Sequence, residues 1–122
     1  MKSIAIVGAS ANREKFGNKA VRAFLQRGWT VHPINPKETT IEGLAVVRSV
    51  ADLPAGVDEA SVYLPPTAVP GLLKELAAKG IRRVWLNPGT ESDPALQVAE
   101  ELGIEAMVAC SIVGVGVNPG EL

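Results

Sequence analysis

The chain has 122 residues, of which 47% are hydrophobic and 20% charged, and its formal net charge is −1 at pH 7. This length suits one domain with its own core, so we expect residues 1–122 to form a single domain. A charge near zero gives no attraction toward nucleic acid, and no apolar run approaches the roughly 20 residues that cross a bilayer. One cysteine, Cys110, makes neither an internal disulfide nor a thiolate metal site. We therefore expect a cytoplasmic protein that binds no nucleic acid, membrane or metal.

Strand-sized apolar runs alternate along the chain with helix-length amphipathic segments. The expected strands are residues 4–7, 29–35, 45–47, 59–64, 82–87 and 105–110; the expected helices are 19–27, 67–80 and 93–103, with a helical turn at 49–53 and a loop at 37–44. Such alternation is typical of parallel βαβ units with right-handed crossovers. The prediction is an α/β fold, a Rossmann-like, doubly wound, mainly parallel open sheet of five to six strands with helices on both faces.

The last expected helix has the clearest boundary signals. Asp93 stands where an N-cap belongs, and Pro94 follows at the first helical position. On this assignment Leu96, Ala99 and Leu102 face the core. Thr67 is the corresponding N-cap expected for the preceding helix.

The loop after the first strand, Gly8-Ala9-Ser10-Ala11-Asn12, keeps the first glycine of the dinucleotide fingerprint G-x-G-x-x-G and lacks the other two. In that fingerprint the first glycine makes the tight turn, the second lets the backbone approach a pyrophosphate, and the third lets the helix pack closely on the strand. Ser10 replaces the second glycine. Arg13 and Lys15 follow where their charges can reach a phosphate. The loop favours nucleotide binding but not an ordinary, tightly held NAD.

Ligands of open parallel sheets bind outside the carboxyl ends of the strands, so the residues that follow each strand are the candidates. The candidate binding residues are Gly8, Ala9, Ser10, Arg13, Lys15, Asn35, Pro36, Lys37, Tyr63, Leu64, Pro65, Asn87 and Gly89. Glycine, proline and asparagine also make ordinary turns between strands and helices. It is the convergence of four such loops on one edge of the sheet that favours a binding site.

The end of the second strand discriminates between nucleotides. NAD sites usually carry an acidic residue there for the ribose hydroxyl, whereas this chain has Asn35-Pro36-Lys37. A lysine attracts a phosphate on the ribose, as in coenzyme A or, less favoured by the incomplete glycine pattern, NADP. Glu38 follows directly and opposes this attraction.

The spaced combination of five motifs resembles the small stand-alone CoA-binding proteins of bacteria. The motifs are Ile6-Val7-Gly8-Ala9-Ser10, Pro33-Ile34-Asn35-Pro36-Lys37, Val62-Tyr63-Leu64-Pro65-Pro66, Trp85-Leu86-Asn87-Pro88-Gly89-Thr90 and Val108-Ala109-Cys110. The fold of that family is similar to the CoA-binding domain of the succinyl-CoA synthetase alpha subunit. The glycine-rich end of this chain, residues 114–120, departs from close relatives.

The resemblance implies a role for each of the four loops. It implies that the first loop, with Gly8, Ser10 and Arg13, holds the pyrophosphate, and that Asn35 and Lys37 meet the adenosine phosphate. It further implies that two loops bracket the pantetheine arm, through Tyr63, Leu64 and Pro65 on one side and Asn87 and Gly89 on the other. Synthetase activity is not implied, because 122 residues leave no room for a ligase domain.

No catalytic set is evident in the sequence. The only histidine, His32, lies in an expected strand beside Pro33, and Cys110 is more simply a small buried hydrophobe. We therefore expect no catalytic residue, and the favoured function is non-catalytic binding of coenzyme A or an acyl-CoA. Two alternatives stay open: an NADP- or NAD-responsive regulator or oxidoreductase, and a protein-interaction domain that has lost its ligand. The sequence identifies no protein partner.

Overall fold

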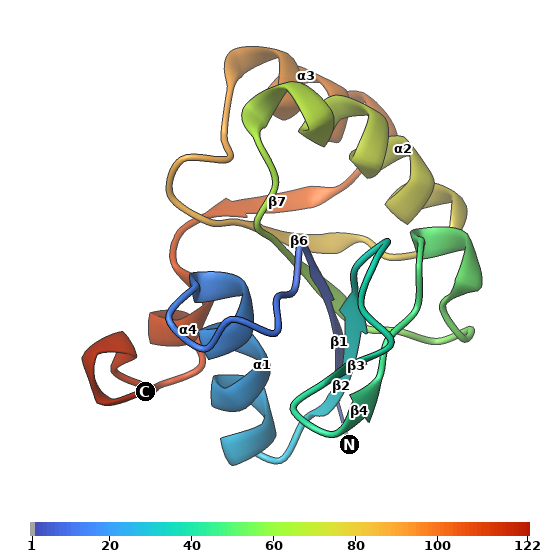
Figure 1. Cartoon of the computed structure of the whole chain (residues 1–122). Coiled ribbons are helices and arrows are strands. Elements are labelled where there is room, and N and C mark those ends of the chain that lie inside the picture. The colour runs from blue at the N-terminus through green and yellow to red at the C-terminus, as the bar shows by residue number, and fades with distance from the viewer. Residues whose placement is uncertain (1) are drawn as a thin grey trace.

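The computed structural model describes residues 2–122 and has a five-stranded sheet at its centre (Figure 1). The strands are β1 (Ser3–Val7), β2 (Thr30–Ile34), β5 (Glu59–Val62), β6 (Arg83–Leu86) and β7 (Glu105–Val108). Their order is β2-β1-β5-β6-β7, and every pairing in this sheet is parallel. The predicted Rossmann-like α/β fold is confirmed, with five strands in the sheet.

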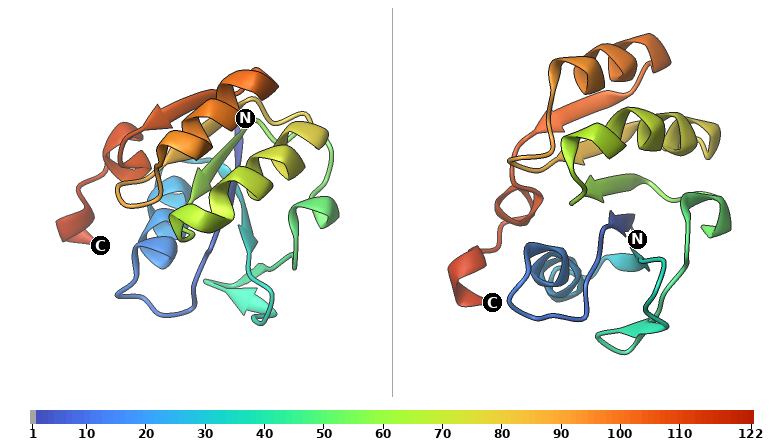
Figure 2. Two further views of the ribbon diagram at one scale, coloured as in Figure 1. Left: turned by 90° about the horizontal axis from the view of Figure 1, so that it is seen from above. Right: turned by 45° about the horizontal axis from the view of Figure 1, so that its top comes forward.

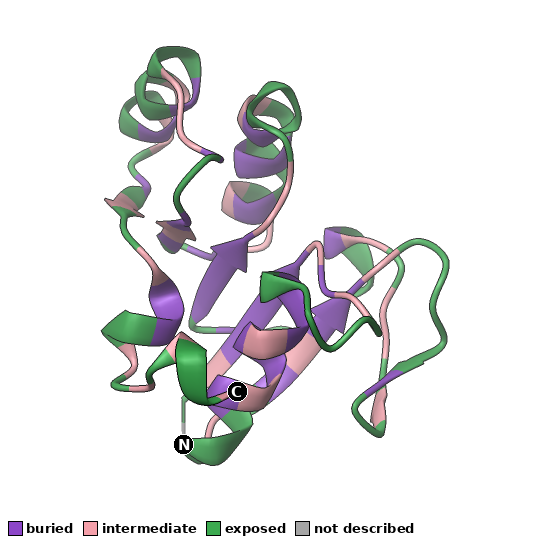
Figure 3. Ribbon diagram, turned by 60° about the vertical axis from the view of Figure 1, so that its left-hand side comes forward, coloured by how far each residue is buried: buried purple, intermediate pink, exposed green. Residues whose placement is uncertain are grey.

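Helices cover both faces of the sheet (Figure 2). Helices α1 (Phe16–Gln26) and α4 (Ser111–Gly114) lie on one face, and α2 (Val69–Ala78) and α3 (Asp93–Leu102) lie on the other. Because side chains alternate along a strand, Ile4 and Ile6 of β1 pack toward α1 while Ala5 and Val7 pack toward α2 and α3. The central strands are consequently buried on both sides (Figure 3).

The predicted caps of two helices are wrong. Helix α3 is capped by Ser92, whose Oγ accepts a hydrogen bond of 3.2 Å from the amide of Ala95, while Asp93 lies in the first turn. The buried residues of this helix are Ala95 and Ala99, and Leu96, which is one position away from that stripe, is 38% exposed. Thr67 is no cap either, since it lies in the 3-10 turn η2 (Pro66–Ala68) that precedes α2.

The segment between β2 and β5 differs from the prediction of a loop at 37–44 and a strand at 45–47. It forms a small antiparallel hairpin of β3 (Thr40–Ile41) and β4 (Leu44–Ala45), separate from the main sheet. The turn consists of Glu42 and Gly43, both with positive φ (50° and 79°), as a type I′ hairpin turn requires. The helical turn η1 (Val50–Asp52) follows, close to where it was predicted.

The chain after β7 is more structured than its glycine content suggests. The strand predicted over 105–110 ends at Val108, and Cys110 stands at the N-cap position of α4. The 3-10 turn η3 (Pro119–Glu121) comes next, and Arg27 Nε donates a 3.0 Å hydrogen bond to the carbonyl oxygen of Val115. In the described part of the chain, no helix combines the length and apolar character needed to cross a membrane.

Candidate functional site

The strand order places a topological switch point between β1 and β5. The chain leaves β1 for α1 on one face of the sheet and leaves β5 for α2 on the other, so the loops after these strands diverge. The amide of Tyr63 donates a 2.8 Å hydrogen bond to the carbonyl oxygen of Val7, which holds the two strand ends together. Ligands of doubly wound sheets bind at such a point.

Two glycines allow the backbone to pack closely there. Gly8 has a φ of +86°, and a β-carbon at this residue would collide with the carbonyl oxygen of Tyr63. A β-carbon at Gly17, in the first turn of α1, would collide with the carbonyl oxygen of Gly8. Gly17 thus has the structural role of the missing third fingerprint glycine, because it lets the helix approach the strand end. Sequence reasoning missed it because Gly17 lies outside the G-x-G-x-x-G spacing.

The first of two adjoining hollows, the amide-rich pocket, lies between the loop after β1 and the end of β2. It has a volume of about 540 Å³. Its lining residues are Gly8, Ala9, Ser10, Lys15, Phe16, Gly17, Asn35, Pro36, Tyr63 and Leu64. It is lined by Lys15 and by the first residues of α1, whose backbone amides lack intrahelical acceptors, and this combination favours an anion.

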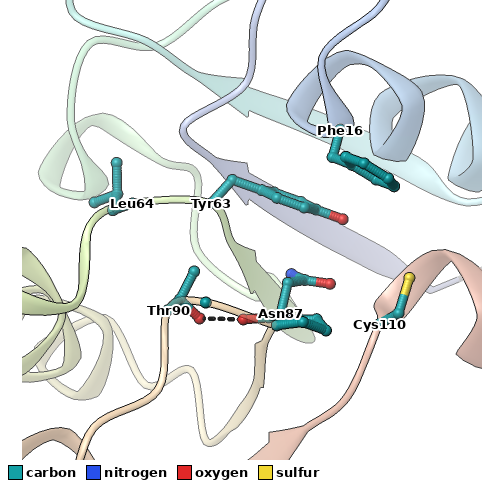
Figure 4. Close-up of a pocket in the computed structure, with 8 residues that line it drawn as sticks. Phe16, Tyr63, Leu64, Asn87, Thr90 and Cys110 are labelled. Atoms are coloured by element: carbon teal, nitrogen blue, oxygen red, sulfur yellow. Dashed lines mark hydrogen bonds between the residues drawn. The ribbon is translucent and has the colours of Figure 1, made fainter.

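The second hollow, the apolar pocket, has a volume of about 490 Å³ (Figure 4). Its lining residues are Phe16, Tyr63, Leu64, Asn87, Pro88, Gly89, Thr90 and Cys110. The two pockets share Phe16, Tyr63 and Leu64, so they adjoin along these side chains. In Figure 4 the rings of Phe16 and Tyr63 and the thiol of Cys110 gather around the same space.

A buried polar network supports the apolar pocket. The Asn87 amide nitrogen donates to Ser61 Oγ (2.8 Å) and to the carbonyl oxygen of Val62 (2.9 Å), and its Oδ1 accepts from the amide of Ser111 (2.8 Å). The hydroxyl of Ser111 lies 2.7 Å from Ser61 Oγ and 3.3 Å from the Tyr63 hydroxyl. Asn87 therefore connects β5, β6 and α4, and the hydrogen-bonding groups of its side chain are already paired within the protein.

Burial is also the main electrostatic influence on Tyr63. It raises the pKa of the phenol above its ordinary value of 10.0, and the hydrogen bond with Ser111 opposes this shift only in part. The phenol stays protonated at neutral pH and lies at the boundary of the two pockets, with the Ser111 hydroxyl as its hydrogen-bond partner.

The turn after β6 is stabilised by the side-chain carboxylate of Glu91, which lies within the turn. Glu91 Oε1 accepts a 2.8 Å hydrogen bond from the amide of Gly89, and backbone amides of this turn hold the pKa of Glu91 below its ordinary 4.5. The hydroxyl of Thr90 donates to the carbonyl oxygen of Asn87 at 2.7 Å. The polar groups at this rim of the apolar pocket are thus largely paired within the protein.

Asn35 links the loops after β1 and β2. Its amide nitrogen donates to the carbonyl oxygen of Ala9 (2.8 Å), and its Oδ1 accepts from the amides of Lys37 (2.7 Å) and Glu38 (3.0 Å). Asn35 shapes the amide-rich pocket by fixing this turn. Its side chain, like that of Asn87, is already hydrogen-bonded.

Three of the predicted binding residues lie outside both pockets. Within residues 2–122, Arg13, Lys37 and Pro65 line neither hollow. The guanidinium of Arg13 faces Glu42, with Nε 3.5 Å from Oε2, and Lys37 is exposed on its turn. Pro65 is exposed at the start of η2.

Some pocket residues were not predicted. Besides Gly17, these are Phe16, Pro88, Thr90 and Cys110, which come from the start of α1 and the segments after β6 and β7. Phe16 carried the most visible sequence signal, an aromatic residue just before the predicted helix; in the structure this residue is 51% exposed. Among the described residues, no three His, Cys, Asp or Glu side chains are placed to hold a metal ion.

Comparison with known proteins connects this geometry to a family. A family model described as a CoA binding domain matches residues 2–115. The chain is 35% identical over 81 residues to the ADP-forming acetate–CoA ligase of Methanocaldococcus jannaschii, covering 66% of this chain and 12% of that ligase.

Solved structures agree with this match. A conserved hypothetical protein from Pyrococcus furiosus superposes with a TM-score of 0.87 at 36% identity, covering 93% of this chain and 99% of that one. The dinucleotide-forming acetyl-coenzyme A synthetase 1 of Ca. Korarchaeum cryptofilum, in complex with phosphate and ADP, has a TM-score of 0.78 at 27% identity, over 88% of this chain and 25% of that one. The protein described here belongs to the CoA-binding domain family.

Proposed function

We propose that this chain binds coenzyme A or an acyl-CoA at the carboxyl edge of the sheet and catalyses no reaction on it. The observation that carries the proposal is the junction of the amide-rich and apolar pockets at Phe16, Tyr63 and Leu64. A ligand that spans both needs a phosphate-bearing part and a long, less polar arm. Coenzyme A has both, as a pyrophosphate and a pantetheine chain.

The proposed placement follows from the chemistry of each hollow. The pyrophosphate lies beside the loop after Gly8, where the first-turn amides of α1 and the Lys15 ammonium stabilise negative charge. The pantetheine arm extends past Tyr63 along Leu64 and Pro88, with its thiol end toward Cys110. The phenol of Tyr63 donates to an amide oxygen of the arm as it passes.

A binding role without catalysis is supported by the use that the protein makes of its own polar groups. Asn87 and Thr90 line the apolar pocket, but both are engaged in hydrogen bonds within the protein. The relatives named as ligases are much longer, and this chain spans 12% of the Methanocaldococcus jannaschii ligase. Their activity is therefore not part of the proposal.

A binding panel with coenzyme A, acetyl-CoA, NADPH and ADP tests the proposal. A ligand present at about one hundred times its Kd adds about 2.7 kcal/mol to the free energy of unfolding, which raises Tm by several degrees in a domain of this size. We expect this shift with coenzyme A or acetyl-CoA, and we expect acetyl-CoA to be recovered unchanged after incubation. A shift with NADPH but none with either CoA compound would refute CoA binding, and loss of the thioester would refute the non-catalytic role.

A pair of lysine variants locates the ligand. Lys15→Gln removes the cation of the amide-rich pocket, whereas Lys74→Gln removes an exposed cation from α2 that lines neither pocket. We expect Lys15→Gln to weaken coenzyme A binding about tenfold, the lower end of what the loss of one charge-assisted contact costs, and Lys74→Gln to leave the Kd unchanged. Equal effects of the two variants would place the phosphates elsewhere.

A further inference from the structure

A third hollow of about 270 Å³, the Arg48 groove, continues the site across the switch point. It shares Gly8, Pro36 and Leu64 with the amide-rich pocket, so the two adjoin. Leu72 of α2 and the exposed Arg48 are among its lining residues. All three hollows share Leu64, and the amide-rich pocket shares two further residues with each of the other two.

The backbone before Arg48 is fixed against the end of β2. The amide of Val47 donates to the carbonyl oxygen of Pro33, and the amide of Asn35 donates to the carbonyl oxygen of Val47, both at 3.1 Å. Val47 and Ile34 form an isolated parallel bridge. Arg48, which directly follows Val47, consequently lies at the same edge of the sheet as the loop after β1.

The charges of the site point to Arg48 rather than Lys37. Within the described chain, Arg48 has no carboxylate at salt-bridge distance, whereas Arg13 is paired with Glu42. Lys37 lines none of the three hollows. The other charged residue of the groove, Glu75 of α2, disfavours an anion on its own side, so the favourable place for a phosphate is beside Arg48.

Two cationic residues therefore line two different hollows, Lys15 the amide-rich pocket and Arg48 the Arg48 groove. This separation suits a nucleotide with two separate phosphate groups. Resting on the function proposed above, we propose that Arg48, and not Lys37, binds the ribose phosphate of the nucleotide and sets the preference for coenzyme A over dephospho-CoA. A planar guanidinium binds a phosphate through two parallel hydrogen bonds, which a lysine cannot do.

Calorimetric titration with coenzyme A and dephospho-CoA tests this assignment. We expect the wild-type protein to bind coenzyme A about tenfold more tightly than dephospho-CoA, the effect of one charge-assisted contact. Arg48→Ala removes this preference by weakening coenzyme A alone, and Arg48→Lys retains part of it. Lys37→Ala, which removes a cation that lines none of the three hollows, retains all of it.

The outcomes separate the two proposals. Arg48 is overturned as the phosphate contact if Arg48→Ala weakens both ligands equally, if Lys37→Ala abolishes the preference, or if the wild-type protein binds both ligands equally. Each of these results leaves CoA binding intact. Failure of the wild-type protein to bind either ligand overturns both proposals. Both side chains are exposed, so unchanged Tm values without ligand verify that the variants are folded.

Discussion

Gly8 is restricted in two ways at the point where β1 meets the candidate site. Its φ of +86° is unfavourable for any residue with a β-carbon, and such an atom would collide with the carbonyl oxygen of Tyr63. Tyr63 cannot retreat easily, because its amide is bonded to Val7 and its hydroxyl lies beside Ser111. Gly8 thus determines both the packing of the strand ends and the shape of the amide-rich pocket.

We predict that Gly8→Ala lowers the free energy of unfolding by about 2 to 4 kcal/mol, since strain in φ adds to a backbone collision. Urea unfolding measures this loss. Gly71→Ala is the matched control, because Gly71 lies in α2, a β-carbon added there would meet open space, and alanine stabilises a helix by up to about 1 kcal/mol relative to glycine. A Gly8→Ala protein as stable as the wild type would show that the turn has another accessible conformation.

At the residue scale, the sequence predicted positions better than roles. Gly8 was found because a tight turn after a buried strand has a recognisable pattern. The scaffold functions of Asn35 and Asn87 could not be predicted, because their partners Ala9, Val62 and Ser111 come from distant segments. A side chain's availability to a ligand depends on such partners, which spacing along the chain does not reveal.

The β3–β4 hairpin reaches over to the loop after β1. The carboxylate of Glu42, at the hairpin turn, accepts a 3.1 Å hydrogen bond from the side-chain amide nitrogen of Asn18 and lies 3.5 Å from Arg13 Nε. Asn18 in turn donates to the carbonyl oxygen of Ser10 at 2.9 Å. The hairpin thereby holds the loop and also neutralises the charge that Arg13 would offer to a bound anion.

We predict that Glu42→Gln strengthens coenzyme A binding up to about fivefold, since it frees Arg13 from an exposed ion pair worth about 0 to 1 kcal/mol. The glutamine oxygen still accepts from Asn18, so the loop stays in place. Glu38→Gln removes the same charge from an exposed neighbouring position and is the control. Titrations at low salt compare the three proteins. If Glu38→Gln has the same effect as Glu42→Gln, the gain reflects net charge and not the release of Arg13.

At the element scale, long periodic segments were predictable and short ones were not. Helix α2 was foreseen from the spacing of Val69, Leu72, Leu73 and Leu76, all of which are buried. The hairpin was missed because strands of two residues carry no periodicity. Helix α4 was missed because it has only four residues and ends in Gly114. A glycine is needed there, since a β-carbon at Gly114 would collide with the ring of Trp85.

For the whole molecule, the rule that parallel strands direct their carboxyl ends to one edge predicted where the candidate site lies. It did not predict the division of that edge into three hollows. Phe16, Tyr63 and Leu64 separate the apolar pocket from the amide-rich pocket, and Leu64 also lines the Arg48 groove. The opposite edge has a different task. There Asp58 Oδ2 accepts from the Ser3 amide at 2.8 Å and joins the start of β1 to the segment before β5.

This contact makes the fold sensitive to acid. The backbone hydrogen bond from Ser3 is the main cause that lowers the pKa of Asp58 below its ordinary 3.8. The folded state therefore favours the carboxylate, and its contribution to stability is complete above the ordinary pKa and lost as pH falls through the lower, folded value. The lowered pKa of Glu91 acts in the same direction.

We predict that Asp58→Asn is less stable than the wild type at neutral pH but loses less stability on acidification to about pH 3, because the titrating contact is gone. Urea unfolding at the two pH values measures both quantities. Glu100→Gln removes a carboxylate from the exposed side of α3 and should lose as much stability as the wild type. If Asp58→Asn shows the full wild-type loss, the acid sensitivity arises from other carboxylates, and the Ser3 contact does not couple protonation to the joining of β1 and β5.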